Sequence, residues 1–184
     1  ISILMKVLTK VFIIHGTGGS PNGNWFPWLK NKLEEIGYKV LIPKFPTPKD
    51  QNLQNWLEVL NKYKSEIDEN TIFIGHSLGS AFILNYLEKI NIKIKSAFLI
   101  AGFIGLLNNK QFDDLNKSFI NKNFNWEKIK RNCSKIYIIN SDNDPYVPLE
   151  KGKEMADKLD TELIIIHNAG HINDPVFDHC VRTG

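Results

Sequence analysis

The sequence contains very little cysteine, two residues in 184. Cys133 and Cys180 stand far apart and have no CxxC or Cys/His spacing, which excludes a disulfide framework or a zinc site of those kinds. We therefore expect reduced thiols, a cytoplasmic location, and neither a metal nor another cofactor.

Long hydrophobic segments are also missing. No run approaches about 18 apolar residues, the length that a membrane-spanning helix needs. The first 11 residues are interrupted by Lys6 and Lys10 and have neither the apolar region nor the cleavage site of a signal peptide. We expect a protein without a membrane partner. Met5 is a candidate natural start, with residues 1–4 as an upstream remnant.

Charge of one sign is scarce as well. The 23 Lys and Arg residues nearly balance 20 Asp and Glu residues, which leaves a formal net charge of +3 with no basic run. So small an excess argues against a nucleic-acid or anionic-membrane partner. A length of 184 residues fits one domain, residues 1–184, whose core needs no disulfide or metal to close it.

An alternation of two kinds of segment is present instead. Short β-branched apolar runs alternate with segments of helical spacing, which predicts an α/β fold: a mostly parallel six-stranded sheet with helices on both faces. We expect strands at residues 10–14, 39–42, 71–74, 96–100, 135–140 and 162–166. We expect helices at residues 25–36, 53–67, 78–90, 126–131 and 149–159. The polar segment 102–125 is expected to be irregular and to overhang the site, as the one candidate for a lid.

A serine stands between the third predicted strand and the helix after it. Residues 75–79 read Gly-His-Ser-Leu-Gly and match G-x-S-x-G in the strand-turn-helix context that gives this motif its meaning. The turn would expose the hydroxyl of Ser77, and the backbone N–H of Leu78 would stabilise an oxyanion. The competing interpretation is a turn with a capping serine. We expect Ser77 to be a nucleophile.

A serine hydroxyl needs a base, and the base needs a group that orients it. In parallel sheets that carry a G-x-S-x-G turn, the three groups follow in the chain order serine, acid, histidine. Asp142 and Asp144 follow the fifth predicted strand, and His171 follows the sixth. Asp144 is favoured as the acid because it begins a D-x-x-V-P stretch, whereas Asp142 suits a cap of the turn. The alternative for His171 is an exposed loop histidine.

The loop after the first predicted strand, residues 15–20, is rich in glycine. It lacks both the full P-loop pattern and the dinucleotide-binding pattern. We expect it to supply the second oxyanion donor, the backbone N–H of Thr17 or that of Gly18.

Three residues are candidates for substrate binding. Trp25 begins a predicted helix and is the candidate for the pocket rim, although aromatic residues at such spacing are more often core. Gly18 in the glycine-rich loop and His76 beside the nucleophile are the other two. Cys133 is expected to be a buried small apolar residue rather than a nucleophile.

The order of the motifs resembles a known family. H-G-x-x-G, N-W-F-P-W-L-K, G-H-S-L-G, W-E-K-I-K-x-N-C, S-x-x-D-P-x-V-P and G-H follow one another as in the small α/β-hydrolases typified by retinoblastoma-binding protein 9. The resemblance spans Lys10 to about Asn173. It implies a serine hydrolase with the α/β-hydrolase fold and a minimal cap, in which Ser77, Asp144 and His171 form the triad.

The sequence also departs from that family. It has no L-x-C-x-E motif, so a retinoblastoma-protein partner is not expected. Family chains continue past the catalytic histidine into an amphipathic helix, whereas residues 174–184 are short and polar, so we expect uncovered apolar surface.

The function predicted is hydrolysis of small ester or amide substrates through an acyl-enzyme. A peptidase or acyltransferase with the same triad, and a non-catalytic binding protein that retains the fold, are the alternatives. With one short candidate lid, small or exposed substrates are expected rather than long-chain lipids.

Overall fold

The computed structural model describes residues 8–173, and these contain one six-stranded sheet. The strands lie in the order β2-β1-β3-β4-β5-β6, and every neighbouring pair is parallel. This confirms the parallel sheet predicted from the apolar runs. The strands are β1 (Lys10–Ile14), β2 (Lys39–Leu41), β3 (Thr71–His76), β4 (Ser96–Ile100), β5 (Ile136–Ser141) and β6 (Leu163–Ile166).

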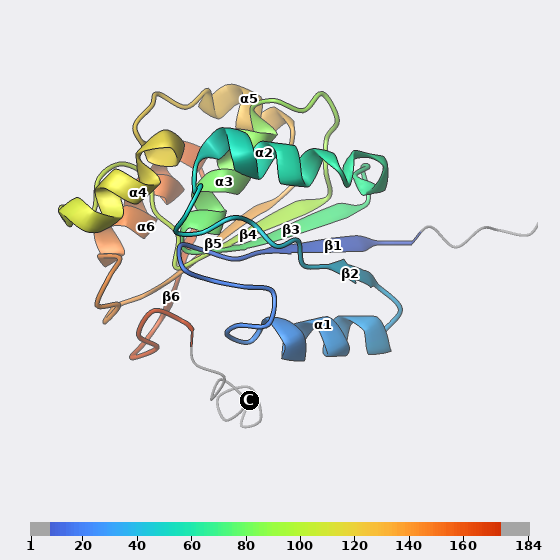
Figure 1. The fold of residues 1–184 in the computed structure, drawn as a ribbon, viewed down its shortest axis with the longest axis horizontal. Coiled ribbons are helices and arrows are strands. Elements are labelled where there is room, and N and C mark those ends of the chain that lie inside the picture. Colours follow the sequence, from blue (N-terminus) through green and yellow to red (C-terminus); the bar gives the residue numbers. More distant parts are fainter. Residues whose placement is uncertain (1–7, 174–184) are drawn as a thin grey trace, which may run out of the picture.

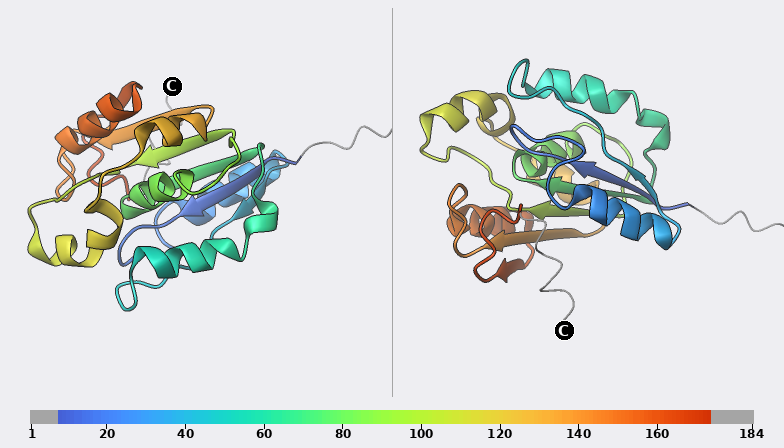
Figure 2. Two further views of the ribbon diagram at one scale, coloured as in Figure 1. Left: turned by 90° about the horizontal axis from the view of Figure 1, so that it is seen from above. Right: turned by 60° about the horizontal axis from the view of Figure 1, so that its bottom comes forward.

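The helices cover the two faces of the sheet unequally. Figure 1 shows α1 below the sheet and the other five helices above it, and the turned views of Figure 2 agree. The helices are α1 (Phe26–Glu35), α2 (Leu53–Asn61), α3 (Leu78–Leu87), α4 (Lys110–Ile120), α5 (Trp126–Arg131) and α6 (Leu149–Leu159), with a 3-10 turn at Lys64–Glu66.

Each face of the sheet has its own apolar core. The larger core lies under the five helices and contains an aromatic group in which Trp56 contacts Phe45, Phe82 and Phe119. The smaller core lies against α1 and is built on Val11, Ile13, Val40, Ile74 and Phe26. Because both faces are covered there, the central strands read as continuous apolar runs.

Strand order determines where a site can form. The chain runs from β1 to β2 on one side and then crosses to β3 on the other, so the loops after β1 and β3 diverge at their carboxyl ends. Open α/β sheets bind ligands at such a point. Because β1 and β3 are neighbours and Ile14 pairs with Gly75, the glycine-rich loop after β1 and the serine turn after β3 begin side by side there.

The segment 102–125 differs from its prediction. It was expected to be irregular, but it contains α4, whose N-cap Asn109 accepts a hydrogen bond from the backbone of Phe112. Polar residues dominate the outer face of this helix, while Asn116, Phe119 and Ile120 are buried against the core. The prediction was wrong because it followed the polar composition of the segment, although Phe112, Leu115, Phe119 and Ile120 have the i, i+3, i+7, i+8 spacing of an amphipathic helix.

Other sequence-based expectations concern the ends of the chain and the membrane. No helix within residues 8–173 is long and apolar enough to cross a bilayer. The edge strand β6 carries two exposed apolar side chains, Ile164 and Ile165. Met5, Cys180 and the short segment 174–184 lie outside the described residues.

Candidate active site

The turn between β3 and α3 holds Ser77 in a strained conformation. Its φ is 55° and its ψ is −122°, a region that a residue with a side chain rarely adopts. The backbone N–H of Ser77 donates to the carbonyl of Ile100 at 2.8 Å. A Cβ on Gly75 would lie 2.7 Å from the Gly79 carbonyl, and a Cβ on Gly79 would lie 2.9 Å from the His15 carbonyl, so neither position has room for a side chain. This geometry fits the nucleophile elbow predicted from G-x-S-x-G.

Two backbone N–H groups remain free beside Ser77. Leu78 begins α3, so its N–H has no carbonyl one turn earlier to donate to. Within residues 8–173, the N–H of Thr17 likewise has no hydrogen-bond acceptor. The loop carrying Thr17 lies against the elbow, because a Cβ on Gly16 would be only 2.8 Å from the Ser77 Cβ. The structure thus brings the two predicted oxyanion donors to the same turn.

Buried His15 anchors that loop. Its Nδ1 lies 2.9 Å from the Gly16 carbonyl, which can only accept, so Nδ1 carries the proton. Its Nε2 then accepts the N–H of Phe45 at 3.1 Å. Burial lowers the pKa of His15, so the ring stays neutral and keeps both hydrogen bonds.

Asp144 and His171 form a buried pair. Asp144 Oδ2 lies 2.7 Å from His171 Nδ1, and the Asp144 side chain has no exposed surface. The other carboxylate oxygen accepts the backbone N–H groups of Tyr146 and Val147 at 2.8 and 3.0 Å. The carboxylate fixes a proton on Nδ1, which leaves Nε2 of His171 unprotonated in the neutral ring.

The loop before Asp144 also orders the loop before His171. Side chains of Ser141, Asp142 and Asn143 accept three successive backbone N–H groups, those of Ala169, Asn168 and Gly170. Asp142 pairs with the exposed His167 at 2.5 Å and not with His171. The backbone N–H of Asn168 and the His167 side chain lower the pKa of Asp142. Asp142 therefore caps the turn, as the sequence suggested.

Two of the predicted substrate-binding residues, Trp25 and His76, bond the backbone at His171 and Ile172 and do not line the cavity beside Ser77. His76 Nε2 donates to the His171 carbonyl at 2.9 Å, and Trp25 Nε1 donates to the Ile172 carbonyl at 2.8 Å. Burial and the nearby His171 ring lower the pKa of His76 to about 4. Both rings pack with Phe26, in or beside the smaller core. Their position supports the His171 loop rather than a substrate.

A cavity of about 220 Å³ opens beside Ser77 and His171. Thr17 also lines it, and the segment 102–125 contributes Phe103, Leu107, Phe112 and Asn116. The prediction that this segment overhangs the site is confirmed. Tyr146, Val147 and Asn173 complete the lining. The sequence did not predict a role for the other lining residues, Phe103, Leu107, Phe112, Asn116, Tyr146, Val147 and Asn173. The one signal was the position of the segment 102–125 after β4.

Gly18 does not line this cavity. Its φ is +70°, and its N–H donates to Thr47 Oγ1 at 2.6 Å, so it is not available to an oxyanion. Of the two donors left open by the sequence, Thr17 is the one that remains free.

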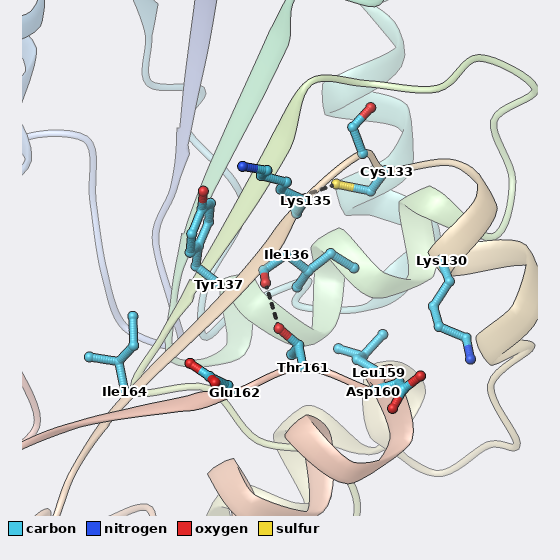
Figure 3. A pocket seen from close by; sticks show the side chains of 11 residues that line it. Lys130, Cys133, Lys135, Ile136, Tyr137, Leu159, Asp160, Thr161, Glu162 and Ile164 are labelled. Atoms are coloured by element: carbon cyan, nitrogen blue, oxygen red, sulfur yellow. Dashed lines mark hydrogen bonds between the residues drawn. The ribbon is translucent and has the colours of Figure 1, made fainter.

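A second, larger cavity of about 630 Å³ lies at the amino ends of the strands, away from Ser77 (Figure 3). It is bounded by the starts of β5 and β6, and its residues include Cys133 and Thr161. Cys133 Sγ donates to the Lys135 carbonyl, and burial raises the pKa of its thiol to about 11. Such a thiol is a poor nucleophile, which confirms the expectation of a small buried residue.

A parallel sheet whose third strand leads into a strained serine turn is the arrangement of α/β-hydrolases. Comparison with known families gives the more specific assignment. The serine hydrolase family matches residues 11–176, and the chain belongs to that family. Membership supports hydrolase activity and confirms the resemblance to small serine hydrolases.

Individual relatives extend over nearly the whole chain. YdeN of Bacillus subtilis is 33% identical over 164 residues, covering 88% of this chain and 85% of its own. The serine hydrolase RBBP9 of Rattus norvegicus is 29% identical over 177 residues, covering 95% and 92%. The crystal structure of the ydeN gene product superimposes with a TM-score of 0.84 at 29% identity, covering 95% of this chain and 97% of that one. Est1E from Butyrivibrio proteoclasticus shares the fold, with a TM-score of 0.71 at 18% identity over 95% of this chain and 84% of its own.

Proposed function

We propose that the protein hydrolyses small esters or amides through a Ser77–His171–Asp144 triad and an acyl-enzyme intermediate. The observation that carries the proposal is the buried 2.7 Å contact between Asp144 and His171 Nδ1. It leaves the other ring nitrogen for the cavity that His171 shares with Ser77. A histidine held in this tautomer is the base that a serine hydroxyl requires.

The proposed reaction begins with proton transfer from Ser77 to His171 Nε2 as Ser77 Oγ attacks the substrate carbonyl carbon. Negative charge moves to the carbonyl oxygen, where the N–H groups of Thr17 and Leu78 stabilise it. His171 then gives its proton to the leaving alcohol or amine. Water attacks the acyl-enzyme in the same way and releases the acid. Asp144 stabilises the imidazolium during both steps.

Neutral His76 suits this cycle. The rings of His76 and His171 lie 4.9 Å apart between centroids, so a second positive charge there would oppose protonation of His171. With its pKa lowered to about 4, His76 stays uncharged at neutral pH and keeps donating to the His171 carbonyl.

The size and lining of the cavity favour short substrates. About 220 Å³ is below the roughly 300–1,000 Å³ of sites for drug-sized ligands. Phe103, Leu107 and Phe112 make one side apolar. We therefore propose a carboxylesterase-like enzyme for short acyl groups. From the two isolated cysteines we also propose a reducing compartment such as the cytoplasm.

A series of p-nitrophenyl esters with graded acyl chains tests this function. We expect a burst of p-nitrophenol and the highest kcat/KM for acyl chains of about two to six carbons. Ser77→Ala should abolish the burst, whereas Ser134→Ala, at the cavity by the amino ends of the strands, should keep it. Absence of Ser77-dependent turnover with every ester and amide tried would favour a binding protein. Equal turnover of long-chain esters would contradict the proposed substrate size.

A further inference from the structure

A chain of hydrogen bonds connects the glycine-rich loop to α4, and its direction is fixed at one end by a backbone amide. The N–H of Gly18 can only donate, and it donates to Thr47 Oγ1 at 2.6 Å. The Thr47 hydroxyl proton is then available for Gln51 Oε1, 2.5 Å away. The oxygen of the Gln51 amide is thereby identified as the acceptor that faces Thr47.

A backbone carbonyl fixes the other end of the same chain. Gln51 Nε2 lies 3.3 Å from the carbonyl of Leu115, which can only accept. The same nitrogen donates to Asn116 Oδ1 at 2.8 Å, and the hydroxyl of Thr17 donates to that oxygen at 2.7 Å. Turning the Asn116 amide around would place its nitrogen against Gln51 Nε2, a donor against a donor. Its oxygen is used internally, and its nitrogen faces away from Gln51.

The nitrogen left over belongs to a buried residue of the catalytic cavity. Asn116 is only 2% exposed, and it lines the cavity together with Ser77 and His171. Within residues 8–173, Asn116 Nδ2 has no hydrogen-bond partner, and it is not sealed in the interior either, unlike Asn140 Oδ1. The cavity is the space to which this donor has access. This donor has no protein partner, so a substrate acceptor that reaches it forms a hydrogen bond that an analogue without the acceptor cannot form.

We propose that Asn116 is a substrate-binding residue whose Nδ2 selects esters or amides with a second oxygen acceptor near the scissile carbonyl. The inference rests on the proposed function of Ser77 and adds a substrate class to it. The acceptor is an ether, hydroxyl or carbonyl oxygen, carried on either the acyl or the leaving-group side. A site built to hydrogen-bond such a group discriminates against an analogue that lacks it more strongly than an apolar pocket discriminates by size.

Two matched pairs of substrates test the selection, one for each side of the ester. On the acyl side, p-nitrophenyl methoxyacetate is compared with p-nitrophenyl butyrate; on the alcohol side, 2-methoxyethyl butyrate is compared with butyl butyrate. Each pair replaces one methylene by an ether oxygen. Rates of hydroxide-catalysed hydrolysis correct for intrinsic reactivity. We expect wild-type kcat/KM to favour the ether in at least one pair by about three- to tenfold.

Asn116→Asp is the informative variant. It keeps an oxygen that accepts from Gln51 and Thr17 but replaces the donor with a second oxygen, so the ether preference should disappear. Asn121→Asp makes the same change at the end of α4, outside the cavity, and should retain the preference. If Asn116→Asp does not fold, the corrected wild-type ratios still decide.

The possible failures can be told apart. Equal corrected rates for both members of both pairs, or a preference unchanged in folded Asn116→Asp, would overturn the role of Asn116 while Ser77-dependent hydrolysis persists. A uniform loss of activity on all four substrates would also overturn it, because it would indicate general positioning. If the wild-type enzyme shows no Ser77-dependent hydrolysis, the proposed function itself fails.

Discussion

At the scale of single residues, two carboxylates only two positions apart have different surroundings. Asp144 is buried and accepts two backbone N–H groups in addition to His171. Asp142 is partly exposed; it accepts the backbone N–H of Asn168 and pairs with the side chain of His167. The same loop therefore provides one group that orients His171 and one that orders the chain leading to it.

Substitution of each carboxylate by its amide separates these roles. Asp144→Asn should lower kcat by about 10³- to 10⁴-fold, because an amide nitrogen opposite Nδ1 favours the wrong tautomer of His171. Asp142→Asn, the matched control, should lower kcat by less than about tenfold, since exposed pairs contribute little. Steady-state kinetics on a short p-nitrophenyl ester measures both. A larger loss in Asp142→Asn would reverse the assignment of the acid.

The order of the motifs was enough to place Ser77, Asp144 and His171, because each follows a strand and parallel strands end at one edge. The roles of Trp25 and His76 could not be read in the same way. Trp25 donates to the carbonyl of Ile172, 147 residues away in the chain, and His76 donates to that of His171, 95 residues away. Only the packed structure determines which side of the histidine loop they face.

At the scale of elements, the glycine-rich loop and the elbow are in direct contact, and two glycines of that loop have different environments. A Cβ on Gly16 would meet the Ser77 Cβ at 2.8 Å and the His76 carbonyl at 3.1 Å. A Cβ on Gly18 would meet no atom within 4 Å, although its φ of +70° is unfavourable for other residues.

These environments predict different effects of the same substitution. Gly16→Ala should displace the Thr17 N–H from the oxyanion position and lower kcat by about 10²- to 10³-fold, with a smaller change in KM. Gly18→Ala should cost about 1 kcal/mol of stability through backbone strain and leave most of kcat intact. Kinetics and urea unfolding measure the pair. Equal kinetic effects would argue against Thr17 as an oxyanion donor.

The helix α4 marks the limit of prediction at this scale. Its sequence is mostly polar, but its apolar residues follow a helical spacing that indicates the helix, and Phe119 packs against Trp56 and Phe82. Its contribution to the site depends on Gln51, which lies 65 residues earlier than Asn116. Hydrogen bonds between segments so far apart leave no local pattern in the sequence.

At the scale of the whole molecule, buried neutral histidines make stability depend on pH. The ordinary histidine pKa is about 6.5, and burial lowers that of His76 to about 4. Between these pH values the unfolded chain binds a proton at His76 that the folded protein does not. The contribution of His76 to the free energy of unfolding is therefore fully present above about pH 6.5 and is lost as pH falls toward 4. A shift of this size corresponds to at most about 3 kcal/mol.

Replacement of the ring removes this contribution. His76→Gln keeps a side-chain N–H for the His171 carbonyl but cannot titrate. We expect its free energy of unfolding in urea to fall less than that of the wild type between pH 7 and pH 4.5. His15 and the carboxylates are present in both proteins and cancel in the difference. An identical fall in both would show that His76 does not contribute to acid sensitivity.

The most direct test of the central claim is labelling of the folded protein with a fluorophosphonate, followed by mass spectrometry of its peptides. A strained, base-activated serine should give one adduct, on Ser77, and Asp144→Asn should acquire it much more slowly. Ser77→Ala should remain unlabelled. Equal labelling of Ser77→Ala, or an adduct on another residue of the wild type, would contradict the assignment of Ser77 as the nucleophile.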